Sequence, residues 1–142
     1  MLILKYLSYL WGPNQPGQML KTIFQYKFTI LMAMLIALLS LLPDSSLPHP
    51  SLFAFRFFDK FVHFSMYAAI SFVALLEARC SEHCRALHLL ILTGILVLSA
   101  LIEVLQATLV ASRAAEWLDL TANALGLVGG YIAYRIFLLI RS

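Results

Sequence analysis

Long apolar stretches alternate with short polar segments along most of the chain. An apolar stretch of about 20 residues can cross the hydrocarbon core of a bilayer as a helix. The first stretch ends at the turn-forming group Pro-Asp-Ser-Ser, and the others end at short segments with charged residues. We therefore predict four membrane-spanning helices, at about residues 24–42, 60–79, 87–111 and 118–140.

The residues before the first predicted span form a shorter apolar segment. No charged region precedes its apolar stretch and no small-residue cleavage site follows, so the segment does not look like a signal peptide. Its apolar stretch, Leu2 to Trp11, has ten residues and is too short to cross a bilayer. We predict that residues 1–23 are an N-terminal interfacial segment with a short helix. Residues 24–142 are predicted to form one all-α domain, a four-transmembrane-helix bundle with up-down-up-down connections.

Composition supports a membrane protein. Hydrophobic residues make up 62% of the 142 residues and charged residues 12%, against about a quarter charged in a soluble domain. A chain this short has too small an interior to bury so many apolar side chains in water. The net charge of +3 comes from scattered Lys and Arg residues that form no basic stripe, so we expect no nucleic-acid partner.

The distribution of Lys and Arg predicts the orientation. Seven of these residues lie in the segments that the four spans place on one side with both termini, and three lie on the other side. Cytoplasmic segments of membrane proteins are enriched in Lys and Arg. We therefore predict that both termini are cytoplasmic.

The few polar residues within the predicted spans gather toward the extracytoplasmic ends. In each span they are three or four positions apart, so they share one face of the helix. Polar groups inside a bilayer usually face the bundle interior. The polar residues of the different helices lie at overlapping depths below the extracytoplasmic surface, so we expect them to form one shared site. The candidate ligand-binding residues are Asp59, Lys60, His63, Tyr67, Glu103, Gln106, Arg113, Asp119 and Asn123.

Two glycines follow the polar residues on the same face of the last predicted span. Gly126 and Gly130 have the G-x-x-x-G spacing, which allows a neighbouring helix to approach closely. We predict that they are helix-packing residues and that the close approach helps to bring the polar groups together.

The chemistry of the polar residues is compatible with several kinds of site. His63, Glu103 and Asp119 are the candidate catalytic residues of a general acid–base site. Lys60 and Arg113 can hold an anion or a sugar phosphate, and the carboxylates can hold a divalent ion. Alternatively, the residues pair only with one another between helices. The sequence assigns no metal ligand, and the cofactor remains unknown.

The two cysteines lie on the predicted cytoplasmic side. Cys80 and Cys84, with His83 and His88 nearby, can be read as a metal site. Thiols on that side are expected to be reduced, and C-x-x-x-C beside a histidine is not a usual zinc spacing. A solvated hairpin is the favoured interpretation.

The polar residues also carry a resemblance to a known family. D-K-x-x-H-F-x-x-Y at 59–67, E-x-x-Q at 103–106, Arg113 and D-x-x-x-N-x-x-G at 119–126 resemble the VanZ-like family of small bacterial integral membrane proteins. That family usually has Pro or Gly before its loop arginine, where this chain has Ala-Ser. The resemblance implies a bacterial cytoplasmic (inner) membrane protein with an envelope role. The founding member is associated with low-level resistance to the glycopeptide teicoplanin.

Three hypotheses for the function are compatible with these residues. The first is a polytopic inner-membrane protein whose outward-facing polar pocket binds or modifies a cell-envelope component, such as a lipid-linked or cell-wall precursor, amid membrane lipids. The second is an intramembrane enzyme that acts on an envelope lipid head group. The third is a structural or partner-binding membrane subunit without catalytic activity. The ligand and the oligomeric state stay open.

Overall fold

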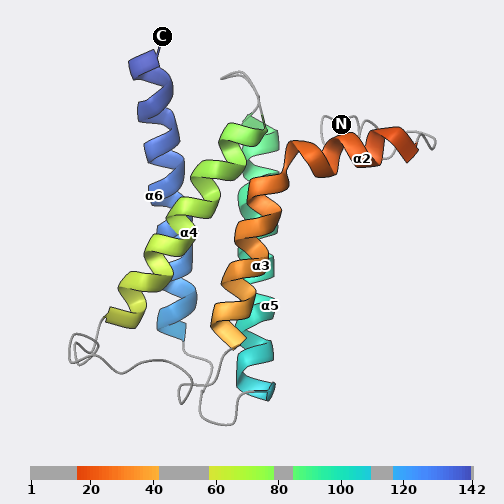
Figure 1. Ribbon diagram of the computed structural model, residues 1–142. Helices are drawn as coiled ribbons and strands as arrows, with labels where there is room; N and C mark the ends of the chain where they lie inside the picture. Colours follow the sequence, from red (N-terminus) through yellow and green to blue (C-terminus); the bar gives the residue numbers. More distant parts are fainter. Residues whose placement is uncertain (1–15, 42–57, 79–84, 110–116, 142) are drawn as a thin grey trace.

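The fold is known from a computed structural model, which describes residues 16–41, 58–78, 85–109 and 117–141. This part of the chain is all α-helical (Figure 1). Its helices are α2 (Pro16–Gln25), α3 (Lys27–Leu41), α4 (Phe58–Glu77), α5 (Arg85–Leu109) and α6 (Trp117–Arg141).

Three helices, α4, α5 and α6, are long and apolar enough to cross a membrane. Each begins and ends within two residues of a predicted span. The all-α class and three membrane-length helices are therefore confirmed. The helix α3 is also apolar but has only 15 residues, so a fourth crossing stays a prediction.

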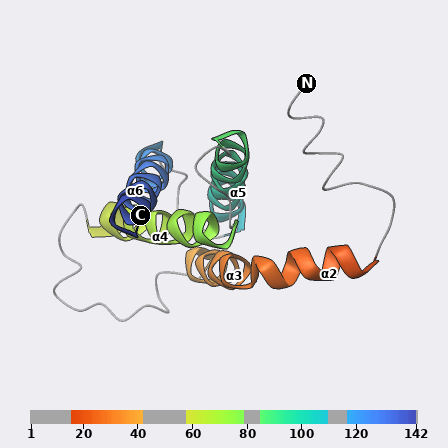
Figure 2. The same cartoon turned by 90° about the horizontal axis from the view of Figure 1, so that it is seen from above.

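The first predicted span differs from the structure at its start. We predicted one helix from residue 24, but α2 ends at Gln25 and α3 begins at Lys27, with Tyr26 between them. In both views α2 extends away from the bundle (Figures 1 and 2). The helix α2 covers the later part of the predicted interfacial segment, and residues 1–15 lie outside the described residues.

Glu77, at the end of α4, explains where α3 begins. Its carboxylate accepts hydrogen bonds from the backbone N–H groups of Phe28 (3.0 Å) and Thr29 (2.9 Å), and from the Thr29 hydroxyl (2.7 Å). These amides belong to the first turn of α3, where backbone donors have no partner within the helix and a negative charge is stabilising. The Gln25 side chain also donates to the Glu77 carbonyl oxygen, at 3.0 Å. The end of α4 therefore holds the junction between α2 and α3.

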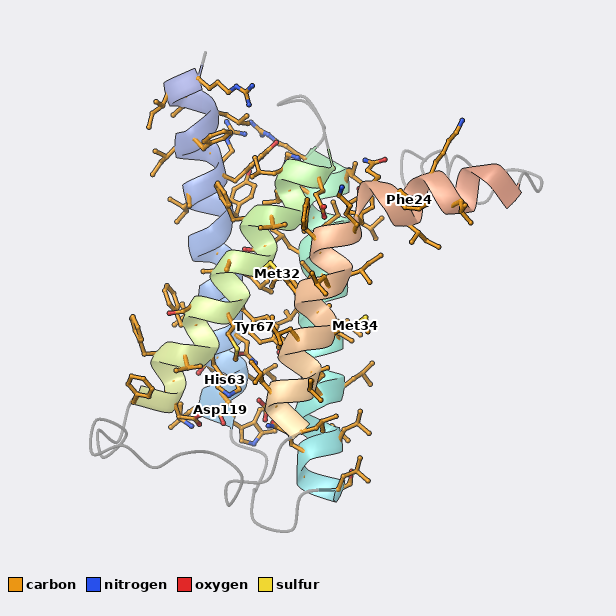
Figure 3. The ribbon with its side chains drawn as sticks, viewed as in Figure 1. Phe24, Met32, Met34, His63, Tyr67 and Asp119 are labelled. Carbon is orange, nitrogen blue, oxygen red and sulfur yellow. The ribbon has the colours of Figure 1, made fainter. Side chains whose placement is uncertain are left out.

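The bundle buries polar side chains and exposes apolar ones. Met34 on α3, for example, is 67% exposed and points away from the other helices (Figure 3). Among the residues that the structure describes, the buried polar ones are Ser40, His63, Ser71, His88, Ser99, Glu103, Gln106, Asp119 and Asn123. An apolar exterior is unfavourable in water but not in lipid, where polar groups instead face the interior. The distribution is that of a membrane protein.

The helices α4 and α6 make the most extensive contact in the described fold. Gly126 and Gly130 lie at that contact, because a β-carbon on either would collide with α4. At Gly126 it would overlap the backbone carbonyl oxygen of Phe64, and at Gly130 that of Ala68. Helices this close need small residues at the crossing point.

Candidate functional site

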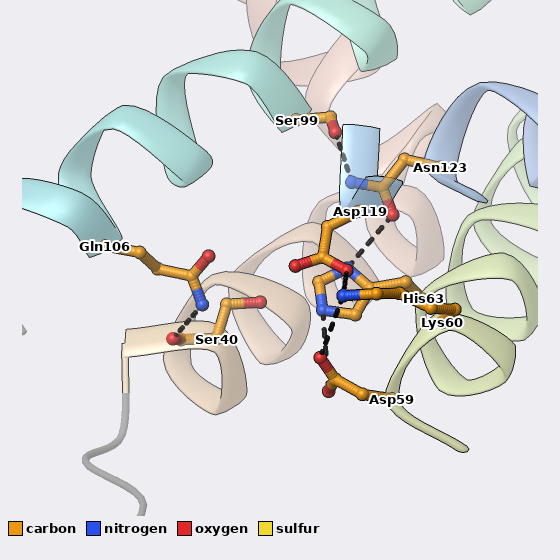
Figure 4. A network of polar contacts seen from close by, with 8 residues as sticks. All are labelled: Ser40, Asp59, Lys60, His63, Ser99, Gln106, Asp119 and Asn123. Carbon is orange, nitrogen blue, oxygen red and sulfur yellow. Dashed lines mark hydrogen bonds and ion pairs between the residues drawn. The ribbon is translucent and has the colours of Figure 1, made fainter. Parts of the chain in front are cut away.

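A cluster of polar side chains lies where α4 and α6 begin, at the lower end of the bundle in Figure 1. His63 and Tyr67 point between the helices there, and Asp119 lies close to His63 (Figure 3). We call the following set the polar cluster: Asp59, Lys60 and His63 of α4, Ser99 of α5, and Asp119 and Asn123 of α6 (Figure 4).

A lysine ion pair joins the first turns of α4 and α6. The Lys60 ammonium pairs with Asp119 Oδ1 and also lies 3.8 Å from Asp59 Oδ2. The side chains of Lys60 and Asp119 are 19% and 12% exposed, whereas that of Asp59 is 54% exposed. Both aspartates lie in the first turn of a helix, where the helix dipole stabilises negative charge.

A chain of two hydrogen bonds lies deeper and joins three helices. His63 Nδ1 is 3.0 Å from Asn123 Oδ1, and Asn123 Nδ2 donates to Ser99 Oγ at 2.8 Å (Figure 4). All three residues are buried. Because a buried amide in an apolar interior is costly unless it is hydrogen-bonded, these contacts fix the three helices relative to one another.

Two further predicted site residues border the polar cluster. Glu103 of α5 is buried and interacts electrostatically with both Asp119 and His63. Tyr67 of α4 is buried in the apolar core, and its hydroxyl interacts with Ser99. Both therefore stand beside the cluster.

Gln106 makes a different contact from the one we predicted. Its amide Nε2 donates to the backbone carbonyl oxygen of Ser40, near the end of α3, at 2.5 Å (Figure 4). This bond joins α5 to α3 instead of α5 to the α4–α6 pair. It satisfies one of the carbonyl groups that the last turn of a helix leaves without a partner.

Of the two residues predicted to hold an anion, Lys60 and Arg113, the structure describes only Lys60. Lys60 is engaged with Asp119, and Arg113 lies outside the described residues. Among the described residues of the site, carboxylates outnumber cationic groups, since Asp59, Asp119 and Glu103 face a single lysine. This balance favours a ligand that brings hydrogen-bond donors or positive charge.

His88, one of the two histidines near the cysteines in the sequence, is buried away from the polar cluster. His88 on α5 packs edge-on against Tyr131 and Tyr134 of α6, with ring centroids 6.3 and 5.4 Å apart. Within the described part of the chain, neither of its ring nitrogens has a hydrogen-bond partner. Cys80, His83 and Cys84 lie outside the described residues, so the hairpin prediction stays a prediction.

Ser99 belongs to the polar cluster, although it is not among the residues predicted from the sequence. The sequence contains one indication of this role. Ser99 precedes Glu103 by four residues and so shares a helix face with it. A serine within an apolar helix is unremarkable by itself, since its hydroxyl can bond to its own backbone. The partner that gives it a role, Asn123, is on another helix.

One subset of the polar cluster has a composition that can hold a metal ion. Asp59, His63 and Asp119 each offer one ligand atom, and these three atoms lie within 4.8 Å of one another. Nitrogen and carboxylate oxygen together are a common ligand set for first-row metal ions.

Comparison of this chain with protein-family models, curated proteins and solved structures found no match. The resemblance to the VanZ-like family therefore stays a prediction.

Proposed function

We propose that this chain is a polytopic membrane protein whose polar cluster binds or modifies the head group of a cell-envelope component, such as a lipid-linked or cell-wall precursor. The observation that carries the proposal is the gradient of exposure, from 54% for the Asp59 side chain to 1% for Asn123. Groups that serve only to join helices do not need an open edge. A head group in the interface can reach Asp59 without leaving the bilayer.

We propose a four-span, up-down-up-down topology in the bacterial inner membrane, with both termini cytoplasmic and the polar cluster facing outward. The distribution of Lys and Arg supports this orientation. The 15 residues of α3 measure about 22 Å as a helix, less than the roughly 30 Å of a hydrocarbon core. As the fourth span, α3 needs residues beyond its described end or a locally thinned bilayer.

Lipid analysis of the purified protein tests the binding proposal. We expect an envelope lipid or precursor to be enriched over its share in the surrounding membrane, as measured by mass spectrometry. Asp59→Asn should reduce that enrichment several-fold without changing membrane abundance, because Asp59 is exposed. Thr108→Ala is a matched control, since Thr108 is exposed and its hydroxyl donates to backbone carbonyl groups of its own helix. An equal lipid content in Asp59→Asn and Thr108→Ala would overturn the proposal.

Susceptibility to teicoplanin tests the envelope role that the resemblance implies. Expression of the chain in a susceptible bacterium should raise the inhibitory concentration of teicoplanin. We expect graded loss of the effect in variants of the cluster, strongest for Arg113→Ala and Asn123→Ala. Susceptibility unchanged by the unmodified chain would count against a role in glycopeptide resistance.

A second candidate function is an intramembrane enzyme that acts on a lipid head group. The orientation of His63 favours it, because one ring nitrogen is held by Asn123 while the other faces the exposed carboxylate of Asp59. A histidine held at one ring nitrogen can act as a general base through the other, where a substrate proton comes within hydrogen-bond reach. His63→Ala should then abolish turnover of the head group while membrane abundance is kept.

A third candidate is a structural or partner-binding subunit. Each hydrogen bond of the polar cluster joins two different helices, which favours a role in holding the bundle together. In that case His63→Ala and Asn123→Ala should both disappear from the membrane, and no lipid should be enriched.

A further inference from the structure

The hydrogen bonds of Asn123 indicate which ring nitrogen of His63 carries a proton. Asn123 donates its amide N–H to Ser99, so its oxygen, Oδ1, is the atom that faces His63 Nδ1. An amide oxygen can only accept a hydrogen bond, and therefore Nδ1 carries the proton. In the neutral ring this leaves a lone pair on Nε2.

That lone pair points toward negative charge. His63 Nε2 lies 4.0 Å from Asp59 Oδ1, which is beyond hydrogen-bond distance. His63 itself is only 5% exposed. A lone pair that faces a carboxylate is unfavourable unless a proton or a metal ion lies between them. His63 Nε2 is therefore a possible nitrogen ligand that faces the carboxylate of Asp59.

The charge around this position is not balanced by Lys60. Two aspartates share the one lysine, and Glu103 adds a third carboxylate within electrostatic range. Asp59, Asp119 and Lys60 together carry more negative than positive formal charge. Because excess charge is costly near hydrocarbon, a bound cation would stabilise the folded protein.

We infer that Asp59, His63 and Asp119 bind a divalent transition-metal ion, and that zinc is preferred over magnesium and calcium. An imidazole nitrogen with two carboxylate oxygens suits zinc, whereas magnesium and calcium take oxygen ligands almost exclusively. Asn123 would then act as the outer partner that holds the other nitrogen of a metal-bound histidine, as is usual at such sites.

Binding requires a small rearrangement that the structure permits. Ligand atoms of a tetrahedral zinc ion lie about 3.4 Å apart for bonds of about 2.1 Å. The three atoms of the cluster lie within 4.8 Å of one another, so they must approach by up to about 1.4 Å. The exposed side chain of Asp59 can make this movement. Lys60 must leave Asp119, and its long aliphatic stem allows the ammonium to turn toward water.

Titration of the purified full-length protein in detergent with zinc chloride tests the inference. Both cysteines are first replaced by serine, Cys80→Ser and Cys84→Ser, because thiolates also bind zinc. We expect one equivalent of zinc by calorimetry, and an affinity for magnesium or calcium at least about tenfold weaker. The inference does not depend on the proposed function, because zinc binding is measured here without any envelope component.

Variants of the cluster separate a metal site from an ion-pair network. Asp59→Asn and Asp119→Asn should each weaken zinc binding at least about tenfold, and Asn123→Ala about 10- to 100-fold. Lys60→Met should instead tighten binding, because it removes the cation that competes for Asp119. Glu77→Gln is the matched control, a carboxylate at the opposite end of α4 whose loss should leave zinc affinity unchanged.

Asp59→Asn provides a test even if the variants at buried positions fail to fold, because Asp59 is exposed. Asp59→Asn should retain the thermal unfolding transition of the parent protein, because its side chain is half exposed. Equal zinc affinity in the parent and in Asp59→Asn would overturn the inference. So would the absence of zinc binding by the folded parent, and the residues would then form an ion-pair network only.

Discussion

Asn123 joins three helices through a single side-chain amide. Its oxygen accepts from His63 on α4 and its nitrogen donates to Ser99 on α5, while its own backbone belongs to α6. An amide suits this position because it offers a donor and an acceptor side by side. Aspartate would keep the acceptor but would add a charge to a group that is 1% exposed.

Replacement of Asn123 should destabilise the bundle more than replacement of Ser99. Asn123→Ala removes both hydrogen bonds and leaves the buried His63 N–H unsatisfied, at a cost of about 1–3 kcal/mol. Ser99→Ala leaves the bond to His63 intact and should cost less. Thermal unfolding in detergent measures both, and equal melting temperatures for the two variants would contradict this account.

The glycines of α6 provide a test of close helix packing at single positions. In Gly126→Ala the new methyl group would collide with the backbone carbonyl of Phe64, which cannot rotate away, so the helices must separate. We expect a loss of about 1–3 kcal/mol, the usual cost of overpacking. Gly94→Ala is the matched control, since a β-carbon there would meet nothing within 4 Å.

The measurement for this pair is again the melting temperature in detergent. Gly94→Ala should leave it unchanged or raise it, because alanine is the better helix former. If Gly126→Ala and Gly94→Ala behave alike, α4 and α6 do not approach as closely as described.

At the scale of the helices, the apolar pattern predicts three elements within two residues but not the bend between α2 and α3. Each of the three follows from local properties of a long apolar stretch. The bend depends on Glu77, which is 48 positions from Thr29 in the sequence and meets it only after α3 and α4 have packed. No local pattern contains that information.

The start of α3 should depend on the carboxylate of Glu77. Glu77→Gln keeps the shape of the side chain but removes the charge and one of two acceptor oxygens, so the amides of Phe28 and Thr29 cannot both be satisfied. We expect a loss of about 1 kcal/mol, typical of a lost helix cap. Thr29→Val removes only the hydroxyl contact and should cost less.

Stability of the α2–α3 junction can be followed by hydrogen exchange. In Glu77→Gln the amides of residues 28 and 29 should exchange faster than in the parent protein, whereas those of α6 should be unchanged. Unaltered exchange at residues 28 and 29 would show that α3 begins at Lys27 for another reason.

At the scale of the whole molecule, the number of crossings decides where the two termini lie. Four spans put both termini on the same side, whereas three put them on opposite sides. A reporter fused after Ser142 and one fused before Met1 should therefore both be active only in the cytoplasm. Activity of the two reporters on opposite sides of the membrane would exclude a crossing by α3.

The site is predictable from sequence only where a single helix carries the relevant spacing. Asp59 and His63 on α4, and Asp119 and Asn123 on α6, stand four residues apart, and the structure brings these pairs together. Gln106 shares a face with Glu103 but bonds to α3, because helices of different tilt diverge toward their ends. Ser99 can be assigned to the site only from its hydrogen bond with Asn123, which lies on another helix.

The pairing of α4 with α6 constrains how the protein is made. The helix α4 emerges from the ribosome before α5, and its closest partner, α6, emerges after α5. Until then, a chain already inserted as far as α5 has His63 and Lys60 without Asn123 and Asp119. Such an intermediate needs shielding from lipid by water, by the insertion machinery or by a chaperone. The polar cluster is therefore completed only when α6 arrives, and a truncation that removes α6 should be degraded instead of accumulating in the membrane.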